Sequence, residues 1–377
     1  MTMRVAIVGG GPVGLATAIG ARLAGLSPVI FEARSGLIDK ACGEGLMPGA
    51  MAALRRLGVD PAGSPIRGIR YQDARRAVEH RYGPGREGRG VRRLVLHAAL
   101  LERASELGVA RRTMRVDGFS ADASGVVVDG DRFDALVGAD GLHSRVRAVA
   151  GLDRGPARAA RRGSSAGRAE TAARSAPAAP AAAAAAARER ALGADGRRFG
   201  LRQHFAVAPW SDLVEVTYLD DVELYVTPVD EGTVGVAVLG RRPLDLAAAI
   251  ARVPSLAERL SGAAPASELR AAGALRQRTR ARTSGRVALV GDASGYVDAL
   301  TGEGLRVGLA QSEQLVAALA AGTLPAYERA WSRSTRDFRM LTAGLLAAAT
   351  SPARGLIVPA AAAMPRVFGA VVDRLAR

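Results

Sequence analysis

The residues whose types and spacing point most directly to chemistry are three glycines and one acid near the start of the chain. Gly9, Gly11 and Gly14 follow the pattern G-x-G-x-x-G, and Glu32 lies eighteen residues beyond Gly14. In this pattern the first glycine permits a tight turn, the second lets a pyrophosphate approach the backbone, and the third lets a helix pack on a strand. A glutamate at the position of Glu32 accepts hydrogen bonds from a ribose and repels a 2′-phosphate. These residues predict a dinucleotide site.

A strand, a helix and a second strand must hold these residues in place. Residues 5–8 are apolar, residues 15–24 carry apolar side chains at helical spacing, and residues 28–32 have the composition of a second strand. This order predicts a βαβ unit whose helix N-terminus faces the phosphates with its free amides. A glycine pattern alone is weak in a chain with 45 glycines, but the flanking elements and the acid agree with it.

Two later segments repeat the form of a strand that ends beside an acid and a glycine. Residues 133–139 lead into Asp140-Gly141, and residues 287–290 lead into Gly291-Asp292. Ligands of doubly wound sheets bind at the C-terminal ends of strands, although acid–glycine pairs are also typical of ordinary turns. Both interpretations stay open for each pair. Two further glycines precede a segment of helical spacing, Gly302 and Gly304.

The rest of the chain indicates a second domain and an unusual insertion. Residues 207–239 alternate as the strands of a mostly antiparallel sheet do. Residues 154–198 consist almost entirely of Ala, Arg, Gly, Pro and Ser, and they lack the bulky apolar residues that offset the cost of ordering a chain. We therefore expect a surface insertion that is partly disordered.

Composition excludes several classes of protein. The 377 residues, 49% of them hydrophobic, are too many and too apolar for a disulfide miniprotein or a disordered tail. The formal net charge of +16 could indicate nucleic acid, but residues 67–93 carry +6 of it and residues 154–198 carry +7. No nucleic-acid motif accompanies this local surplus, so no nucleic-acid partner is expected. Cys42 is the only cysteine, which excludes an intramolecular disulfide and a cysteine-based metal site.

No apolar run is long enough to predict a membrane span or a signal peptide. The two apolar segments near the C-terminus, residues 340–349 and 355–364, are interrupted by prolines and an arginine before about 18 residues accumulate. We expect them to form packed helices and expect a soluble, cytoplasmic protein. Peripheral contact of these helices with a membrane surface stays open, and the oligomeric state is not predicted.

Three ordered motifs give the chain a family resemblance. The glycine pattern with Glu32, then Asp140-Gly141, then Gly291-Asp292 resembles the FAD-dependent monooxygenases of the aromatic-hydroxylase superfamily. The resemblance implies that Gly11 and Glu32 bind the adenosine half of FAD and that Asp292 contacts the pyrophosphate and ribityl chain. It also implies a role for Asp140-Gly141 in the use of NAD(P)H.

Two further segments match relatives of that superfamily. Arg93, which precedes a helix, falls on an arginine that approaches the flavin phosphates, although a solvated arginine at a helix start would look the same. The loop around Cys42-Gly43 resembles the one beside the isoalloxazine ring in geranylgeranyl reductases and flavin-dependent halogenases. Cys42 is a candidate thiol or simply a small buried residue. The segment after Gly291-Asp292 is also closer to this branch, but the tryptophan motif of tryptophan halogenases is absent from the sequence, which disfavours halogenation.

The resemblance implies an α/β fold: a Rossmann-like FAD-binding domain, an inserted and mostly antiparallel substrate domain, and C-terminal helices. The predicted boundaries are 1–150 and 276–325 for the FAD domain, with 66–90 contributing to the substrate region, 151–198 for the insertion, 199–275 for the substrate domain and 326–377 for the helices. The expected cofactor-binding residues are Gly9, Gly11, Pro12, Gly14, Glu32, Ala33, Arg34, Cys42, Gly43, Arg93, Asp140, Gly141, Gly291, Asp292, Gly302 and Gly304. No catalytic residue and no metal ligand is predicted.

The leading hypothesis for function is an FAD-dependent oxidoreductase, a monooxygenase that NAD(P)H reduces transiently and that hydroxylates an organic small molecule through a flavin hydroperoxide. A double-bond reductase of the geranylgeranyl-reductase kind is the alternative. An enzyme that oxidises a residue of a partner protein, and a nucleic-acid-binding or scaffold protein without turnover, rank lower. Substrate-lining candidates in the strand-rich region are His204, Trp210, Tyr218, Tyr225 and Pro228.

Overall fold

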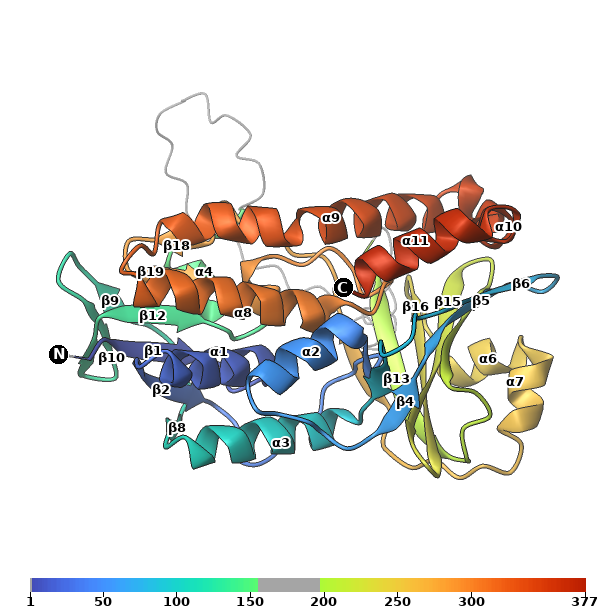
Figure 1. Cartoon of the computed structure of the whole chain (residues 1–377), viewed down its shortest axis with the longest axis horizontal. Coiled ribbons are helices and arrows are strands. Elements are labelled where there is room, and N and C mark those ends of the chain that lie inside the picture. The colour runs from blue at the N-terminus through green and yellow to red at the C-terminus, as the bar shows by residue number, and fades with distance from the viewer. Residues whose placement is uncertain (1, 155–196) are drawn as a thin grey trace, which may run out of the picture.

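The computed structural model describes residues 2–154 and 197–377, and most of the predicted low-complexity insertion lies outside these residues. A six-stranded sheet forms the first half of the molecule, on the left of Figure 1. Its strand order is β18 (Thr283–Ser284), β19 (Val287–Leu289), β12 (Ala135–Gly138), β1 (Arg4–Val8), β2 (Ser27–Glu32) and β8 (Ala110–Thr113). All neighbours are parallel except β18 and β19. The predicted Rossmann-like sheet is therefore present.

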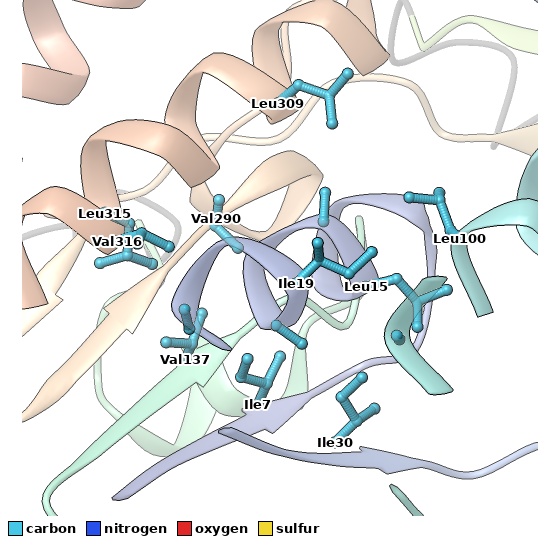
Figure 2. Close-up of a cluster of buried hydrophobic side chains, with 14 of the residues drawn as sticks. Ile7, Leu15, Ile19, Ile30, Leu100, Val137, Val290, Leu309, Leu315 and Val316 are labelled. Atoms are coloured by element: carbon cyan, nitrogen blue, oxygen red, sulfur yellow. The ribbon is translucent and has the colours of Figure 1, made fainter. Parts of the chain in front are cut away.

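Helices cover one face of this sheet. They are α1 (Pro12–Leu23), α2 (Pro48–Arg56), α3 (Arg93–Glu106) and α8 (Gly304–Ala320), and their apolar stripes meet alternate residues of β1, β2 and β12. Figure 2 shows this core, in which Ile7, Ile30 and Val137 point from the strands toward Leu15 and Ile19 of α1. Such strands read as continuous apolar runs because both of their faces are buried.

The other face carries a small antiparallel sheet and a short helix. The sheet comprises β9 (Ser120–Ala121), β10 (Val126–Val128) and β11 (Asp131–Phe133), and the helix is α4 (Arg145–Val149). Phe31 and Phe133 meet edge to face across this layer, with ring centroids 5.8 Å apart. The predicted strand 133–139 is thus divided between β11 and β12, which reach different sheets.

A seven-stranded sheet forms the second half of the molecule, in the order β17 (Arg270–Gly273), β13 (Phe199–Ala206), β16 (Thr233–Gly240), β15 (Val222–Asp230), β14 (Leu213–Tyr218), β5 (Gly68–Gln72) and β6 (Ala77–Arg81). It is antiparallel except where β14 runs parallel to β5, which agrees with the predicted mostly antiparallel sheet. Its outer face packs on α6 (Leu246–Ala251) and α7 (Pro254–Arg259). A three-stranded sheet links the two halves, formed by β3 (Gly45–Leu46), β7 (Gly88–Gly90) and β4 (Ser64–Ile66).

C-terminal helices run across both halves along the top of Figure 1. They are α9 (Ala326–Ala349), the 3-10 turn η2 (Pro352–Leu356), α10 (Ile357–Ala363) and α11 (Pro365–Leu375). The helices expected near the C-terminus exist, but the expectation that they are packed is only partly right. Leu356 is 64% exposed and Met364 is 52% exposed. Among the described residues, no single helix is long and apolar enough to cross a membrane. Ala326–Ala349 and Pro352–Ala363 together have the length and composition of a span, but the two segments meet at a bend of 102°.

Candidate functional site

A cleft of about 460 Å³ lies between the two large sheets. The C-terminal ends of β1, β2, β12 and β19 form one wall, and β13, β15 and β16 form the other. Every predicted cofactor-binding residue lines this cleft except Gly14, which lies in the first turn of α1. Residues from seven separate segments of the chain therefore converge on one space.

Each glycine of the turn is needed for a different reason. Gly9 has a φ of +109°, and a Cβ there would lie 2.4 Å from the Ala139 carbonyl oxygen. A Cβ on Gly14 would lie 1.9 Å from the Gly9 carbonyl oxygen. A Cβ on Gly11 would meet nothing within 4 Å, because Gly11 faces the cleft at the N-terminus of α1. Gly9 and Gly14 are thus required by the fold, and Gly11 leaves room for a ligand.

Glu32 holds the turn from the end of β2. Its Oε2 accepts a hydrogen bond of 2.8 Å from the Gly10 amide, and its Oε1 accepts from the amide and Nε of Arg34, both at 3.1 Å. Burial alone would raise the pKa of Glu32, but these hydrogen bonds and the Arg34 charge hold it below its usual value. An ionised carboxylate has about four acceptor sites, so Glu32 can also accept from a ribose in the cleft.

His97 is a residue of this turn that sequence reasoning missed. Its Nε2 lies 2.8 Å from the Gly10 carbonyl oxygen, and the Ile38 amide donates to its Nδ1 over 3.3 Å. The Ile38 bond leaves Nε2 as the protonated, donating nitrogen. Burial lowers the pKa of His97, so the ring is neutral at neutral pH. Its place in the sequence, one helical turn after the predicted phosphate ligand Arg93, could have indicated that His97 lies near the site.

The two acid–glycine pairs both reach the cleft, and each also has a local structural task. Asp140 Oδ2 accepts hydrogen bonds from the amides of Arg145 and Val146 and so caps α4, whereas its Oδ1 is buried without a hydrogen-bond partner among the described residues. Asp292 lies in the 3-10 turn η1 (Gly291–Ser294), and its Oδ2 is 3.3 Å from Lys40 Nζ. Each pair therefore both stabilises a local turn and faces the cleft, so the two interpretations are compatible.

The glycines before α8 lie beside a buried acid. Gly302 has a φ of +68° and faces open space, and a Cβ on Gly304 would press on Tyr296 at 3.2 Å. Between them, Glu303 is buried with its Oε2 3.0 Å from Arg306 Nε. Burial raises the pKa of Glu303 to about 8, and Arg306 offsets only part of that effect.

The loop that carries Cys42 is held by contacts from distant segments. Thr227 Oγ1 donates to the Gly43 carbonyl oxygen over 2.9 Å. Glu44 is buried and has a φ of +59°, which is uncommon for a residue with a side chain. Its Oε1 accepts from the Arg93 amide at the start of α3 over 2.8 Å, and its Oε2 lies 2.6 Å from His204 Nε2. Glu44 was not predicted, because nothing local in the sequence marks it.

His204 extends this network into the seven-stranded sheet. Arg202 Nη1 donates to His204 Nδ1 over 3.1 Å, so a neutral His204 carries its proton on Nε2 and donates it to Glu44. Arg202 also forms a 2.5 Å ion pair with Asp39, and its charge is the main influence that lowers the pKa of Asp39 against the opposing effect of burial. The buried group Asp39, Glu44, Arg202 and His204 is called the inter-sheet network below. Asp39, Glu44 and His204 of this network also line a second cavity of about 240 Å³.

The inner face of the seven-stranded sheet is apolar between two groups of paired charges. The inter-sheet network lies at one end, and at the other Arg198 pairs with Glu223 and Asp298. Between them, the cleft is lined by Tyr225, Ala237, Leu239, Leu275, Tyr296 and Ala299. Burial, with the nearby Asp292 and Asp298 charges, holds the pKa of Tyr296 well above its usual value, so it is a neutral phenol. Of the candidates to line the substrate space, only Tyr225 lines this cleft. His204 lines the second cavity, whereas Trp210, Tyr218 and Pro228 line neither of the two.

A family model described as an FAD binding domain matches residues 2–324. This chain belongs to the FAD-binding domain family. The match confirms the predicted fold class and FAD as the cofactor, and it agrees with the three ordered motifs.

Curated relatives of this flavoprotein match over shorter segments. The FAD-dependent monooxygenase OpS4 of Beauveria bassiana (strain ARSEF 2860) is 30% identical over 174 residues, which is 41% of this chain and 41% of that protein. A menaquinone reductase of Mycolicibacterium smegmatis (strain ATCC 700084 / mc(2)155) is 49% identical over 55 residues, 15% of this chain and 13% of that protein. The matches thus span less than half the length of both relatives. The first agrees with the predicted FAD-dependent oxidoreductase.

Solved structures share the fold of this flavoprotein. The flavin-dependent brominase Bmp2 has a TM-score of 0.77 at 16% identity, with 100% of this chain and 94% of that chain covered. A 2-methyl-3-hydroxypyridine-5-carboxylic acid oxygenase has a TM-score of 0.68 at 20% identity, with 100% and 96% covered. The halogenase CmlS has a TM-score of 0.70 at 17% identity, with 91% and 63% covered. At these identities the likeness concerns the fold.

The residues of the cleft fit FAD. Gly9 and Gly14 leave no room for side chains of their own, whereas Gly11 opens the helix N-terminus to a pyrophosphate. Arg93 has a buried Nε without a hydrogen-bond partner among the described residues and lines the same cleft. A guanidinium left partly unpaired beside a dinucleotide cleft suits a phosphate group.

Proposed function

We propose that this flavoprotein is an NAD(P)H-dependent monooxygenase that hydroxylates an uncharged, apolar organic molecule. The observation that carries the proposal is the continuity of the cleft from the glycine turn to the apolar part of the seven-stranded sheet. A charged substrate needs a counter-charge, but the charges of Arg198 and Arg202, at the two ends of that apolar part, are balanced by Glu223 and Asp39. Each of the two arginines keeps one buried nitrogen without a hydrogen-bond partner among the described residues, but neither lacks a carboxylate partner. The monooxygenase relative supports the same reaction class.

In this proposal the chain contributes binding, orientation and exclusion of water. The amides at the start of α1 and the Arg93 guanidinium would hold the FAD pyrophosphate, Glu32 the ribose, and Asp292 with the Cys42–Gly43 loop the remaining length of the cofactor. When bound, FAD accepts a hydride from NAD(P)H and activates oxygen. Asp140-Gly141 borders the same cleft and is our candidate for contact with NAD(P)H.

Two tyrosines set the polarity of the proposed substrate space. Tyr225 donates its hydroxyl proton to the Leu300 carbonyl oxygen over 2.8 Å, so its oxygen can only accept from a substrate. Burial holds the pKa of Tyr225, like that of Tyr296, well above its usual value, which keeps both rings uncharged. The proposed space therefore favours an aromatic or alicyclic molecule with few polar groups.

Double-bond reduction is the second candidate. The 49% identity to a menaquinone reductase over 55 residues favours it, as does the Cys42 loop. Both candidates use the same FAD site, and they differ in whether oxygen enters the product.

We keep the predicted domain boundaries and propose one role for each segment. We propose that 1–150 and 276–325 bind FAD, that 199–275 with 66–90 faces the substrate, and that 326–377 closes the apolar side of the cleft. Limited proteolysis with and without FAD tests this division: protection by FAD should extend over both FAD segments.

The decisive experiment uses the purified holoprotein. It is reduced without oxygen by NADPH or NADH, air is admitted, and oxygen uptake, peroxide and products are followed over a panel of neutral and anionic aromatic molecules. Oxygen-coupled hydroxylation of neutral molecules is the expected result. Substrate reduction without oxygen would select the reductase, and failure to bind FAD at all would overturn both candidates.

A matched pair of variants tests the position of the substrate. Ala237→Leu adds three carbon atoms to a side chain that lines the apolar part of the cleft. We expect KM for a neutral substrate to rise about tenfold with unchanged FAD content. Ala248→Leu is the control, because Ala248 is exposed on α6, on the other side of the sheet.

A further inference from the structure

The C-terminal helices include a partly exposed segment, residues 340–365, that carries no free charge. From Met340 to Pro365 the only charged residue is Arg354. Its guanidinium is held by Glu223 and by the carbonyl oxygens of Ala349 and Val222. The remaining surface of this segment consists of apolar side chains, hydroxyls and backbone, which is unusual for 26 consecutive residues at the outside of a protein.

The exposed apolar residues come from three successive elements, η2, α10 and α11, with Met364 at the junction of the last two. Leu356, Ala360, Met364 and Val367 lie four, four and three residues apart, and all four are exposed. Leu356 is 64% exposed, Met364 52% and Val367 55%. Together these four residues form what we call the apolar stripe. It crosses η2, α10 and the start of α11 at the right-hand end of the molecule in Figure 1.

Basic residues flank the apolar stripe. The β5–β6 hairpin contacts α10, and the two reach the same end of the molecule in Figure 1. Arg75 and Arg76 are exposed at the hairpin turn, and Arg366 is exposed next to Val367. Within residues 2–154 and 197–377, no carboxylate lies within ion-pair distance of these three guanidinium groups. Asp73, the acid of this turn, accepts hydrogen bonds from the backbone amides of Arg75 and Arg76 instead.

We propose that the apolar stripe and its flanking arginines dock on an anionic phospholipid surface. Apolar side chains would enter the boundary between headgroups and acyl chains, and the arginines would lie at the level of the phosphates. A second copy of this chain fits less well. A twofold contact through the stripe would bring Arg75, Arg76 and Arg366 of both copies together, and like charges at such a contact oppose association.

The apolar stripe lies on helices that also pack near the proposed substrate space. Val358 of α10 and Phe368 of α11 are buried in the same apolar cluster as Tyr218 and Tyr225, and Tyr296 packs against that cluster. The helices that would touch lipid therefore also pack behind the apolar part of the cleft. This arrangement suits an enzyme whose substrate partitions into a bilayer.

The test uses the full-length holoprotein and sedimentation with vesicles. We compare phosphatidylcholine vesicles with vesicles in which about one third of the lipid is phosphatidylglycerol, at low and high salt. We expect binding to the anionic vesicles and about a hundredfold weaker binding for the double variant Leu356→Asp with Met364→Asp. The double variant Arg75→Ala with Arg76→Ala should bind the anionic vesicles about 30-fold more weakly and with a smaller dependence on salt.

Leu23→Asp is the matched control, because Leu23 is 50% exposed at the end of α1, a helix in the other half of the molecule. FAD content and the unfolding temperature check that each variant is folded. The proposal fails if the wild-type protein ignores anionic vesicles, or if Leu23→Asp weakens binding as much as the stripe variants do. It also fails if the stripe variants instead abolish a dimer seen by light scattering, which would identify a second copy as the occupant.

Discussion

The glycine turn and the inter-sheet network border the same cleft, but they are held in place by different means. The turn is built from a continuous stretch of chain, and its geometry depends on the absence of side chains at Gly9 and Gly14. The network joins Asp39 and Glu44 from one loop to Arg202 and His204 from a strand about 160 residues later. Backbone close packing fixes the first region, and buried polar pairing fixes the second.

This difference determines how each region fails. A close-packed backbone tolerates no added atom, but its neighbours keep their hydrogen bonds when it is perturbed. A buried polar network tolerates small changes of shape, but it leaves groups unpaired when one member is removed. Damage to the network should therefore cost more stability and reach both sheets, whereas damage to the turn should mainly affect the cofactor.

The largest effect is expected from Glu44→Ala. Removal of the carboxylate leaves His204 Nε2 and the Arg93 amide without their partner and removes the charge nearest to Arg202 after Asp39. We expect the free energy of unfolding to fall by about 4 kcal/mol, as when one member of a buried pair is deleted. Urea unfolding of the FAD-saturated protein, followed by circular dichroism, measures it.

Glu44→Gly separates the side chain from the backbone. Glu44 has a φ of +59°, where glycine is less strained than alanine by about 1 kcal/mol. The glycine variant should therefore be the more stable of the two while remaining well below the wild type. Equal stability of all three proteins would mean that the network contributes nothing to the fold.

The glycine turn should respond differently at two of its positions. Gly14→Ala drives a Cβ to 1.9 Å from a backbone oxygen, so we expect a loss of about 3 kcal/mol and little bound FAD. Gly11→Ala meets no protein atom within 4 Å, so the apoprotein should keep its wild-type stability while FAD affinity falls. Unfolding of the apoprotein and titration with FAD distinguish the two. A Gly11→Ala apoprotein as unstable as Gly14→Ala would contradict the assignment of Gly11 to the ligand.

The same contrast explains what could be predicted from the sequence. The βαβ unit and its glycine turn follow from local patterns, because a strand, a glycine turn and a helix leave a contiguous record. Fifteen of the sixteen predicted cofactor-binding residues line the cleft, and some of these, such as Arg93 and Cys42, came from the family resemblance. Glu44 and Arg202 were missed, and His204 was expected to face substrate, because their roles depend on one another across two sheets. The strand expected at 133–139 was too long, since a local run cannot show that it divides between two sheets.

The buried acids Glu303 and Glu32 make the stability of the protein depend on pH, and we expect the larger effect from Glu303. Burial raises the pKa of Glu303 to about 8 in the folded protein, above its ordinary value of 4.5. Between these values the unfolded chain loses the proton and the folded chain keeps it, so Glu303 makes the protein less stable as pH rises, by at most about 1.4 kcal/mol per unit. Glu303→Gln should flatten the decline in the free energy of unfolding between about pH 5 and pH 8. An unchanged slope would show that Glu303 is ionised when folded.

Glu32 should make the protein more stable as pH rises, opposite to Glu303, and by a smaller amount. Although burial opposes it, hydrogen bonding from Gly10 and Arg34 holds the pKa of Glu32 below 4.5 in the folded protein. Its contribution is therefore complete above pH 4.5 and disappears as pH falls through the lower folded value. Glu32→Gln should cost about 1 kcal/mol at neutral pH, and the difference from the wild type should shrink in acid. Because Glu32 acts on a turn that Gly9 and Gly14 already hold, the loss should be confined to that turn: hydrogen exchange should rise at the Gly10 amide and stay unchanged at the Arg93 amide. Faster exchange at Arg93 would mean that the two regions are not independent.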